Sequence, residues 1–231
     1  IILVMCYTGQ EASYTTSLIN LLGTETGHVA QNLKFGASGM LPLEMVKADG
    51  SFKYVTANDR LQDLVTTASP PKHAAGNYPA LAADVDNATD ALKARAAAAA
   101  AAWGATAGIS HTSAADATME DLYLINYFKS TAYEMGHLPT AINYAPGDFT
   151  TAMYLNTLPT DKPIGVYCYT GQTSAQVSAY LQMMGYDGKT VYYGIQKLAF
   201  EHDVNTVAWH GPLDDYTSIF VGSGIPTAPA M

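Results

Sequence analysis

Cysteine is scarce in this chain, which has only two such residues among 231. Two cysteines cannot make a zinc site alone, and they cannot form a disulfide framework either. The histidines show no metal-ligand spacing that would complete such a site, so no metal is expected. If the cysteines matter, their role is chemical.

Basic residues are also few. There are 11 Lys and Arg against 20 Asp and Glu, which gives a formal net charge of -9. Nucleic acids and anionic membranes are bound by clustered Lys and Arg, so neither partner is expected. The longest weakly apolar run, Ala96–Ile109, is too short and too rich in alanine to span a bilayer. No signal peptide is visible, but the first residue is Ile1 rather than Met, so export stays open.

What the sequence does contain is one phrase, Cys-Tyr-Thr-Gly-Gln, that occurs twice and includes both cysteines. The copies are Cys6–Gln10 and Cys168–Gln172, and each follows an apolar run. The surrounding pattern predicts strand, loop, helix and strand in both copies, which is typical of a parallel α/β sheet. The predicted strand, helix and second strand are 1–5, 12–22 and 32–36 in the first copy, and 164–167, 175–184 and 190–194 in the second. Each helix is expected to stop at a glycine, Gly23 or Gly185.

Between the copies, residues 66–87 are rich in Pro, Gly and Ala and predict an irregular linker. A helix capped by Asp86, Asn87 or Thr89 should follow and run to about Trp103. Its run of alanines, 96–102, favours a helix because alanine has the highest helix propensity. The alternative is that alanine there stands in for side chains of other types.

A second α/β unit is predicted to begin near residue 118. We expect a buried strand at 122–126, a turn-rich loop over 130–144 that returns to a short strand, and a helix at 149–159. The first unit enters directly at its cysteine strand and lacks a counterpart of these upstream strands. The predicted division is therefore 1–65 as the back half of a first domain, 66–117 as a linker with a connecting helix, and 118–231 as a complete second domain with a C-terminal extension.

Each cysteine is predicted to lie at the carboxyl end of a parallel strand, before a helix N-terminus, where open sheets place their ligands. Backbone amides and the helix dipole there favour a thiolate, the nucleophilic form of cysteine. Gly171 permits the tight turn, Thr170 adds a hydroxyl donor, and Thr173 or Ser174 is expected to cap the helix. Tyr169 is expected to form a pocket wall.

The second unit resembles a rhodanese domain, the sulfurtransferase fold. The likeness is carried by the six-residue loop Cys168–Thr173 and by the preceding segment Gly136–Asn143, which is similar to the family's Gly-His-Ile-Pro-Gly-Ala phrase. Residues 1–40 resemble the back half of another such domain. The resemblance implies an α/β fold, a rhodanese-like parallel sheet flanked by helices, in a tandem arrangement.

In that family the loop cysteine takes a sulfane sulfur from a donor, holds it as a persulfide and passes it to an acceptor such as cyanide or a thiol. The resemblance implies that Cys168 is the nucleophile and that the loop binds the persulfide through Tyr169, Thr170, Gly171, Gln172, Thr173 and Ser174. The donor would be thiosulfate or a protein persulfide, and no cofactor is needed. The resemblance favours an exported bacterial protein over a cytoplasmic one.

Two features depart from the family. Asn126–Phe128 stands where an Asp-Val-Arg phrase is usual, which removes an ion pair. The cysteine loop has no Arg or Lys, so a dianion such as thiosulfate would meet only amides and hydroxyls. A protein persulfide or an uncharged donor suits this loop better. Related phosphatase loops are one residue longer and end in arginine, which Thr173 does not supply, so phosphatase activity is not expected.

A candidate second site consists of Cys6, Tyr7, Thr8, Gly9 and Gln10. Glu11 takes the position of Thr173 there, and its charge opposes thiolate formation and anionic donors. For His137 we expect a hydrogen bond that fixes its loop beside Pro139, because the persulfide mechanism needs no histidine base.

Two other functions stay open. One is a persulfide carrier or protein-binding module without turnover, and the other is a silent scaffold whose loops only bind anions. The first unit also leads us to expect its missing strands on a separate chain or in an upstream segment, since a half-sheet would leave unpaired strand edges.

Overall fold

A computed structural model describes residues 1–37, 65–80, 87–103, 107–109, 121–150, 152–199 and 202–203. Its larger sheet has five strands in the order β3-β7-β6-β4-β5, and every neighbouring pair is parallel. The strands are β3 (Gly108–Ile109), β7 (Gly188–Val191), β6 (Ile164–Tyr167), β4 (Tyr123–Asn126) and β5 (Ile142–Asn143). The predicted strands at 122–126 and 164–167 are confirmed. The strand predicted at 190–194 lies two to three residues earlier.

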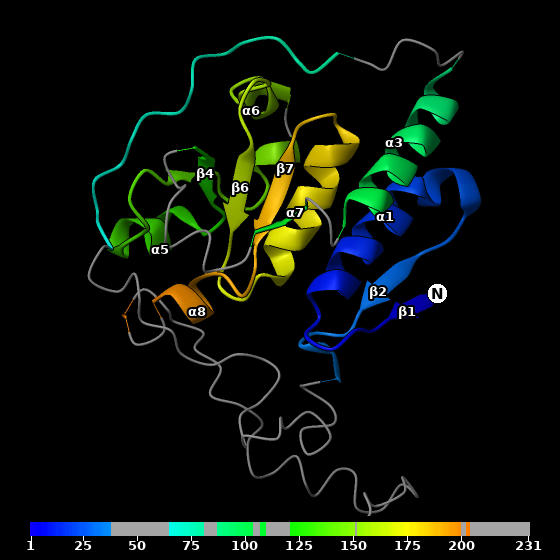
Figure 1. Ribbon diagram of the computed structural model, residues 1–231, viewed down its shortest axis with the longest axis horizontal. Helices are drawn as coiled ribbons and strands as arrows, with labels where there is room; N and C mark the ends of the chain where they lie inside the picture. Colours follow the sequence, from blue (N-terminus) through cyan, green and yellow to red (C-terminus); the bar gives the residue numbers. More distant parts are fainter. Residues whose placement is uncertain are drawn as a thin grey trace, which may run out of the picture.

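Helices cover both faces of this sheet (Figure 1). They are α5 (Ser130–Met135), α6 (Ala152–Leu155), α7 (Gln172–Met183) and α8 (Ile195–Leu198), with a 3₁₀ turn at Asp148–Thr150. The loop predicted over 130–144 therefore contains α5, and the helix predicted at 149–159 is the 3₁₀ turn followed by α6. One core cluster includes Tyr167 and Leu198, and a second includes Val166 and Leu181. Neighbouring residues of β6 thus face opposite cores, which explains its unbroken apolar sequence.

Within its described residues, the first copy forms a smaller parallel sheet of two strands. Strand β1 (Ile2–Val4) is followed by α1 (Gln10–Thr26) and then by β2 (Ala30–Asn32), which pairs with β1. The predicted strand-loop-helix-strand order is confirmed. The predicted helix stop at Gly23 is wrong: the helix continues to Thr26 and ends at Gly27, whose left-handed backbone places its amide on the Gly23 carbonyl. The second strand also comes earlier than predicted.

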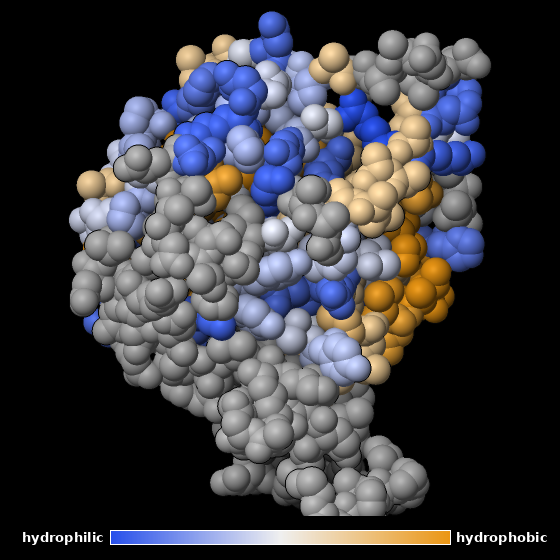
Figure 2. Space-filling view, in the orientation of Figure 1, coloured by the Kyte–Doolittle hydropathy of each residue, from blue (hydrophilic) through white to orange (hydrophobic). Residues whose placement is uncertain are grey.

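Strand β1 differs from β6 in what covers it. β6 lies between β4 and β7 and is buried, whereas β1 pairs with β2 alone among the described residues. Its flank exposes large apolar side chains, and Figure 2 shows this apolar patch at the N-terminal edge of the molecule. The patch comprises Ile1, Ile2, Leu3, Met5 and Val29. That the first copy is the back half of a domain stays a prediction. Residues 38–64, which belong to that prediction, lie outside the described residues.

Helix α3 (Ala88–Ala102) joins the two copies. As predicted, Asn87 caps it, because the side-chain oxygen accepts a hydrogen bond from the Asp90 amide. α3 packs against α1 and α7, and these two helices pack along each other, so three helices lie side by side in Figure 1. The alanines Ala96 and Ala99 are buried in this contact, where small side chains allow close approach.

Parts of the predicted linker contribute to the second unit. β3, within 66–117, pairs in parallel with β7 and so extends the larger sheet. Thr66 forms an antiparallel bridge with His137. Within the described residues, no helix is long and apolar enough to cross a membrane.

Tyr14 links the three helices through one hydroxyl. Its oxygen lies 2.7 Å from the Ala99 carbonyl oxygen and 2.6 Å from Oε1 of Gln182. Burial raises the pKa of Tyr14 to about 12, so the hydroxyl stays protonated at neutral pH. The Tyr14 ring also packs on Trp103, with centroids 4.5 Å apart.

Replacing Tyr14 by Phe should lower the free energy of unfolding by about 1–3 kcal/mol, because the Ala99 and Gln182 oxygens lose the one hydroxyl donor that they share while the ring stays in place. Urea unfolding measures this. Tyr78→Phe is the matched control, since Tyr78 is 53% exposed and its loss of a hydroxyl should change stability little. Equal effects of the two substitutions would contradict the role of Tyr14.

Candidate functional site

Cys168 follows β6 directly and is only 4% exposed. The chain then turns at Gly171, whose φ of 80° places it in the left-handed region, and α7 begins at Gln172. Gly171 is the N-cap residue, and no side chain caps this end of the helix. The expectation that Thr173 or Ser174 caps α7 is therefore wrong, because both lie inside its first turn. The Ser174 amide instead faces the cysteine sulfur.

The Cys168 sulfur receives its contacts from Ser174. The Ser174 amide donates a hydrogen bond to the sulfur at 3.3 Å, and the thiol lies 3.6 Å from the Ser174 hydroxyl oxygen. That hydroxyl is held by the Gly171 carbonyl at 3.1 Å and by the hydroxyl of Thr190 at 2.7 Å. Thr190 lies on β7 and is fully buried. Sequence reasoning missed Thr190, since nothing in its neighbourhood marks it as part of the site.

The remaining side chains of the loop contact other parts of the fold. Tyr169 stacks on Phe128 with ring centroids 4.0 Å apart, so its ring packs against the core cluster of that face. Thr170 accepts a hydrogen bond from Nε2 of Gln172 at 3.1 Å. Gln172 is itself buried. The expected pocket-wall role of Tyr169 and the persulfide contacts of the loop stay predictions.

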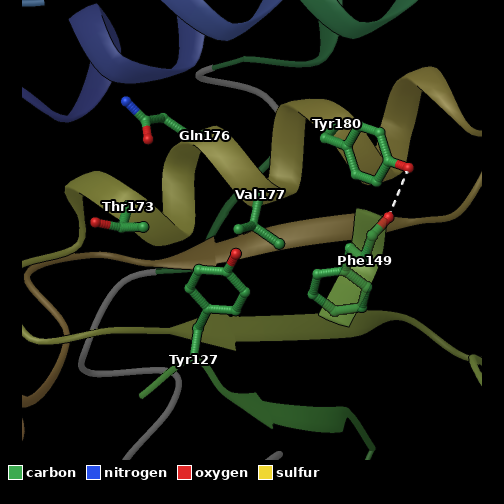
Figure 3. Close-up of a pocket in the computed structure, with 6 residues that line it drawn as sticks. All are labelled: Tyr127, Phe149, Thr173, Gln176, Val177 and Tyr180. Atoms are coloured by element: carbon green, nitrogen blue, oxygen red, sulfur yellow. Dashed lines mark hydrogen bonds between the residues drawn. The ribbon is translucent and has the colours of Figure 1, made fainter. Parts of the chain in front are cut away.

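A cavity of about 260 Å³ lies beside the loop (Figure 3). Its lining consists of Tyr127, Phe149, Thr173, Gln176, Val177 and Tyr180. Thr173 lies in the first turn of α7 and is one of the predicted site residues, so the cavity adjoins the predicted site. Burial is the main reason that the pKa of Tyr127 is raised, and the charges of Asp148 and Cys168 raise it further.

None of the six lining side chains carries a charge at neutral pH. Five of them are aromatic, aliphatic or amide-bearing, and the sixth is a threonine. The Tyr180 hydroxyl is already engaged, because it donates a hydrogen bond to the Phe149 carbonyl at 3.0 Å. The cavity is therefore suited to a neutral group with an apolar part.

Asn126 shows how the fold accommodates its departure from the Asp-Val-Arg phrase. Its amide nitrogen donates to the Tyr167 hydroxyl at 2.9 Å, and its oxygen accepts from the Phe128 amide at 3.0 Å. The Tyr167 hydroxyl also accepts from the Leu138 amide at 3.0 Å. Neutral hydrogen bonds thus hold the end of β4 in the core, next to the strand that carries Cys168.

His137 is fully buried and fixes its loop, as predicted. Its Nδ1 lies 3.0 Å from the Tyr133 carbonyl oxygen, and its Nε2 lies 2.9 Å from the Ala68 carbonyl oxygen. The ring also stacks on Tyr133 at 3.7 Å. Both ring nitrogens are thus engaged by backbone, which is a structural arrangement.

The first loop has a similar geometry in a more open setting. The Cys6 sulfur, half-buried, accepts hydrogen bonds from the Gly9 amide at 3.1 Å and from the Ala12 amide at 3.4 Å. Glu11 is exposed. Burial is the main reason that the pKa of Tyr193 is raised, and the negative charge of Glu11 raises it further. Negative charge therefore lies beside this loop, as the sequence predicts. Tyr7 is 63% exposed, unlike its counterpart Tyr169.

The glutamines of the repeated phrase cross between the two copies. Oε1 of Gln10 accepts a hydrogen bond from the Tyr193 amide at 2.8 Å, and Oε1 of Gln172 accepts one from the Phe35 amide at 2.9 Å. In both loops Nε2 of the glutamine donates to the nearby threonine, Thr8 or Thr170, at 3.1 Å. Sequence reasoning placed both glutamines in their own pockets and missed this exchange.

Residues 113–197 match the family model described as Rhodanese-like domain. This stretch is a Rhodanese-like domain. It contains β4, β6, β7, the Cys168 loop and the cavity beside it. The first cysteine loop lies outside the match, so the tandem arrangement and the truncated first domain stay predictions. The chain matches no curated protein.

Gly194, which follows β7, packs against the backbone of the Cys168 loop. Gly194 has a φ of 52°, and a Cβ there would run into the carbonyl oxygen of Cys168. The next amide, that of Ile195, donates a hydrogen bond to the same oxygen at 3.0 Å. A side chain at Gly194 would therefore meet both backbone strain and a backbone clash at the cysteine.

Gly194→Ala should lower the free energy of unfolding by about 3 kcal/mol or more, because strain and clash add. Gly27→Ala is the matched control: Gly27 has a φ of 70°, but a Cβ added there would meet no atom within 4 Å. It should cost only about 1 kcal/mol from the backbone alone. Urea unfolding compares the two. Similar losses would show that Gly194 does not press against the cysteine loop.

Proposed function

We propose that this protein is a sulfurtransferase that carries a sulfane sulfur as a persulfide on Cys168. The observation that carries the proposal is the Ser174 amide donating to the Cys168 sulfur inside a Rhodanese-like domain. An amide at a helix N-terminus favours a negatively charged sulfur, both as thiolate and as persulfide. The proposal needs no metal or organic cofactor.

The proposed cycle has two displacements on sulfur. In the first, the Cys168 thiolate attacks the outer sulfur of the donor, a new S–S bond forms, and the donor leaves with the electron pair of its broken bond, as sulfite would from thiosulfate. In the second, a thiol or cyanide attacks the outer sulfur of the persulfide and the Cys168 thiolate leaves. Sulfur passes from donor to acceptor, and the cysteine returns unchanged.

The surroundings favour a protein persulfide or an uncharged donor over thiosulfate. A dianion would find no cationic side chain in the loop or among the six residues that line the cavity. Desolvating two negative charges without a cationic partner is costly. The apolar walls at Phe149 and Val177 instead match the carbon part of an organic donor or a side chain of a protein partner.

Exposure to a persulfide donor should add one sulfur, about 32 Da, to the tryptic peptide that contains Cys168, and cyanide should remove it. Mass spectrometry follows both steps. Cys168→Ser should abolish the gain, whereas Cys6→Ser, the matched control in the other copy, should retain it. Sulfur uptake that survives Cys168→Ser and disappears with Cys6→Ser would place the chemistry in the first copy.

A persulfide carrier without turnover is the second candidate. The neutral loop favours it, because a carrier would take sulfur only from a docked protein partner. The two functions differ in kinetics: an enzyme transfers many sulfurs per cysteine with a small donor and acceptor, whereas a carrier stops after one.

Thr173→Arg tests the electrostatic argument. It places a cation where the loop meets the cavity, and it should raise kcat/KM for thiosulfate by roughly tenfold through a charge-assisted contact with the donor. Thr15→Arg adds the same charge at an exposed position of α1 and is the control. No gain with Thr173→Arg, or an equal gain with Thr15→Arg, would show that missing charge in the loop does not limit thiosulfate use.

A further inference from the structure

The turn after β7 holds the backbone of the Cys168 loop. The Ile195 amide donates to the Cys168 carbonyl at 3.0 Å, and the Gln196 amide donates to the Tyr169 carbonyl at 2.8 Å. Gly194 presses against the same Cys168 carbonyl. The position of this turn therefore sets the position of the cysteine.

The turn is held in place from the other copy. Tyr193 starts it with a φ of 65°, an uncommon conformation for a residue with a side chain. Its amide donates to Oε1 of Gln10, which is 2% exposed. Nε2 of Gln10 donates to Thr8, and this bond fixes which end of the amide group faces Tyr193. Gln10 thus supplies a buried, oriented acceptor to a strained backbone.

The second copy supports the first copy through the same arrangement of contacts. Phe35 has a φ of 62°, and its amide donates to Gln172. After Gly36, the Ala37 amide donates to the Cys6 carbonyl at 2.8 Å. Each copy of the phrase therefore supports the turn that holds the cysteine of the other copy.

The glycines of the phrase make room for this exchange. A Cβ at Gly171 would run into Oε1 of Gln10 and would lie 2.6 Å from the Tyr193 amide nitrogen. A Cβ at Gly9 would lie 2.6 Å from Oε1 of Gln172. In each Thr-Gly-Gln, the threonine orients the side-chain amide of the glutamine, and the glycine leaves space for the glutamine of the other copy. The glutamine itself reaches across to accept a backbone hydrogen bond in the other copy.

We propose that Gln10 is a positioning residue for the Cys168 loop, and that the first copy keeps Thr-Gly-Gln to support the second, whatever the chemistry of Cys6. The proposal rests on the proposed function only in taking Cys168 as the nucleophile. It accounts for a first loop that retains the crossing residues while Glu11 makes its own pocket unfavourable for anions.

Gln10→Met removes the acceptor and keeps the length of the side chain. Loss of one buried hydrogen bond should slow sulfur uptake at Cys168 by about fivefold or more. Alkylation of Cys168 by iodoacetamide should become faster by a similar factor, about fivefold, because a loosened turn opens more often around a buried thiol. Peptide mass spectrometry measures both rates at Cys168 alone.

Three variants separate positioning from general damage. Gln10→Glu keeps an acceptor for the Tyr193 amide but buries a carboxylate without a cationic partner, so both rates should lie between those of Gln10→Met and those of the starting protein. Gln31→Met makes the same chemical change at an exposed site and should leave both rates unchanged. Thr8→Val removes only the hydroxyl that accepts from Nε2 of Gln10, so it should shift both rates in the same directions as Gln10→Met but by a smaller factor. It keeps the test valid if Gln10→Met does not fold.

The proposal is overturned if Gln10→Met and Thr8→Val leave the alkylation rate of Cys168 unchanged. Absence of sulfur uptake in the starting protein would instead contradict the proposed sulfurtransferase function. The alkylation rates would still decide whether Gln10 positions Cys168.

Discussion

The contact between Gly194 and the Cys168 carbonyl is the constraint on which the site depends. It fixes the end of β6 against the turn after β7, at the middle of a parallel sheet. Once the carbonyl is fixed, the chain has to turn at Gly171 to start α7, and the Ser174 amide then faces the sulfur. The geometry around the sulfur is thus a consequence of backbone packing, with Thr190 holding the serine from the neighbouring strand.

The two copies of the phrase share backbone geometry but differ in what surrounds them. Gly9 and Gly171 have φ values of 81° and 80°, and each copy has a residue at positive φ just before its closing glycine. In the described residues, the second sulfur is buried at the end of the central strand of a five-stranded sheet, whereas the first is half-buried after a strand of a two-stranded one. Similar loops therefore place their thiols in different dielectric environments, and burial strengthens every hydrogen bond to a charged sulfur.

Sequence patterns predicted the elements whose signal is local. The two strand-loop-helix-strand units, the Asn87 cap and the loop-fixing role of His137 all depend on residues close in sequence, or on one recognisable phrase. Helix ends were less predictable, because Gly23 is accommodated inside α1. β3 was missed because two residues, Gly108 and Ile109, are too few to show a period.

The contacts that complete the site could not be predicted from sequence because they join distant segments. Gln10 meets the Tyr193 amide 183 positions later, and Gln172 meets the Phe35 amide 137 positions earlier. A glutamine in a loop beside a cysteine is most simply assigned to the ligand. Only the packing of α1 on α7 shows that both glutamines point across the contact between the copies.

For the proposed sulfur transfer, the neutrality of the site determines how a donor would be selected. A loop with cationic side chains would attract any small anion and would discriminate mainly by charge. Here the sulfur is buried, its polar neighbours are amides and hydroxyls, and the adjoining cavity has aromatic and aliphatic walls. Such a site gains little binding free energy from long-range electrostatic attraction of an anion. Its selectivity has to come from shape and from hydrogen bonds made at contact, which favours a donor that another protein or an apolar group brings into the cavity.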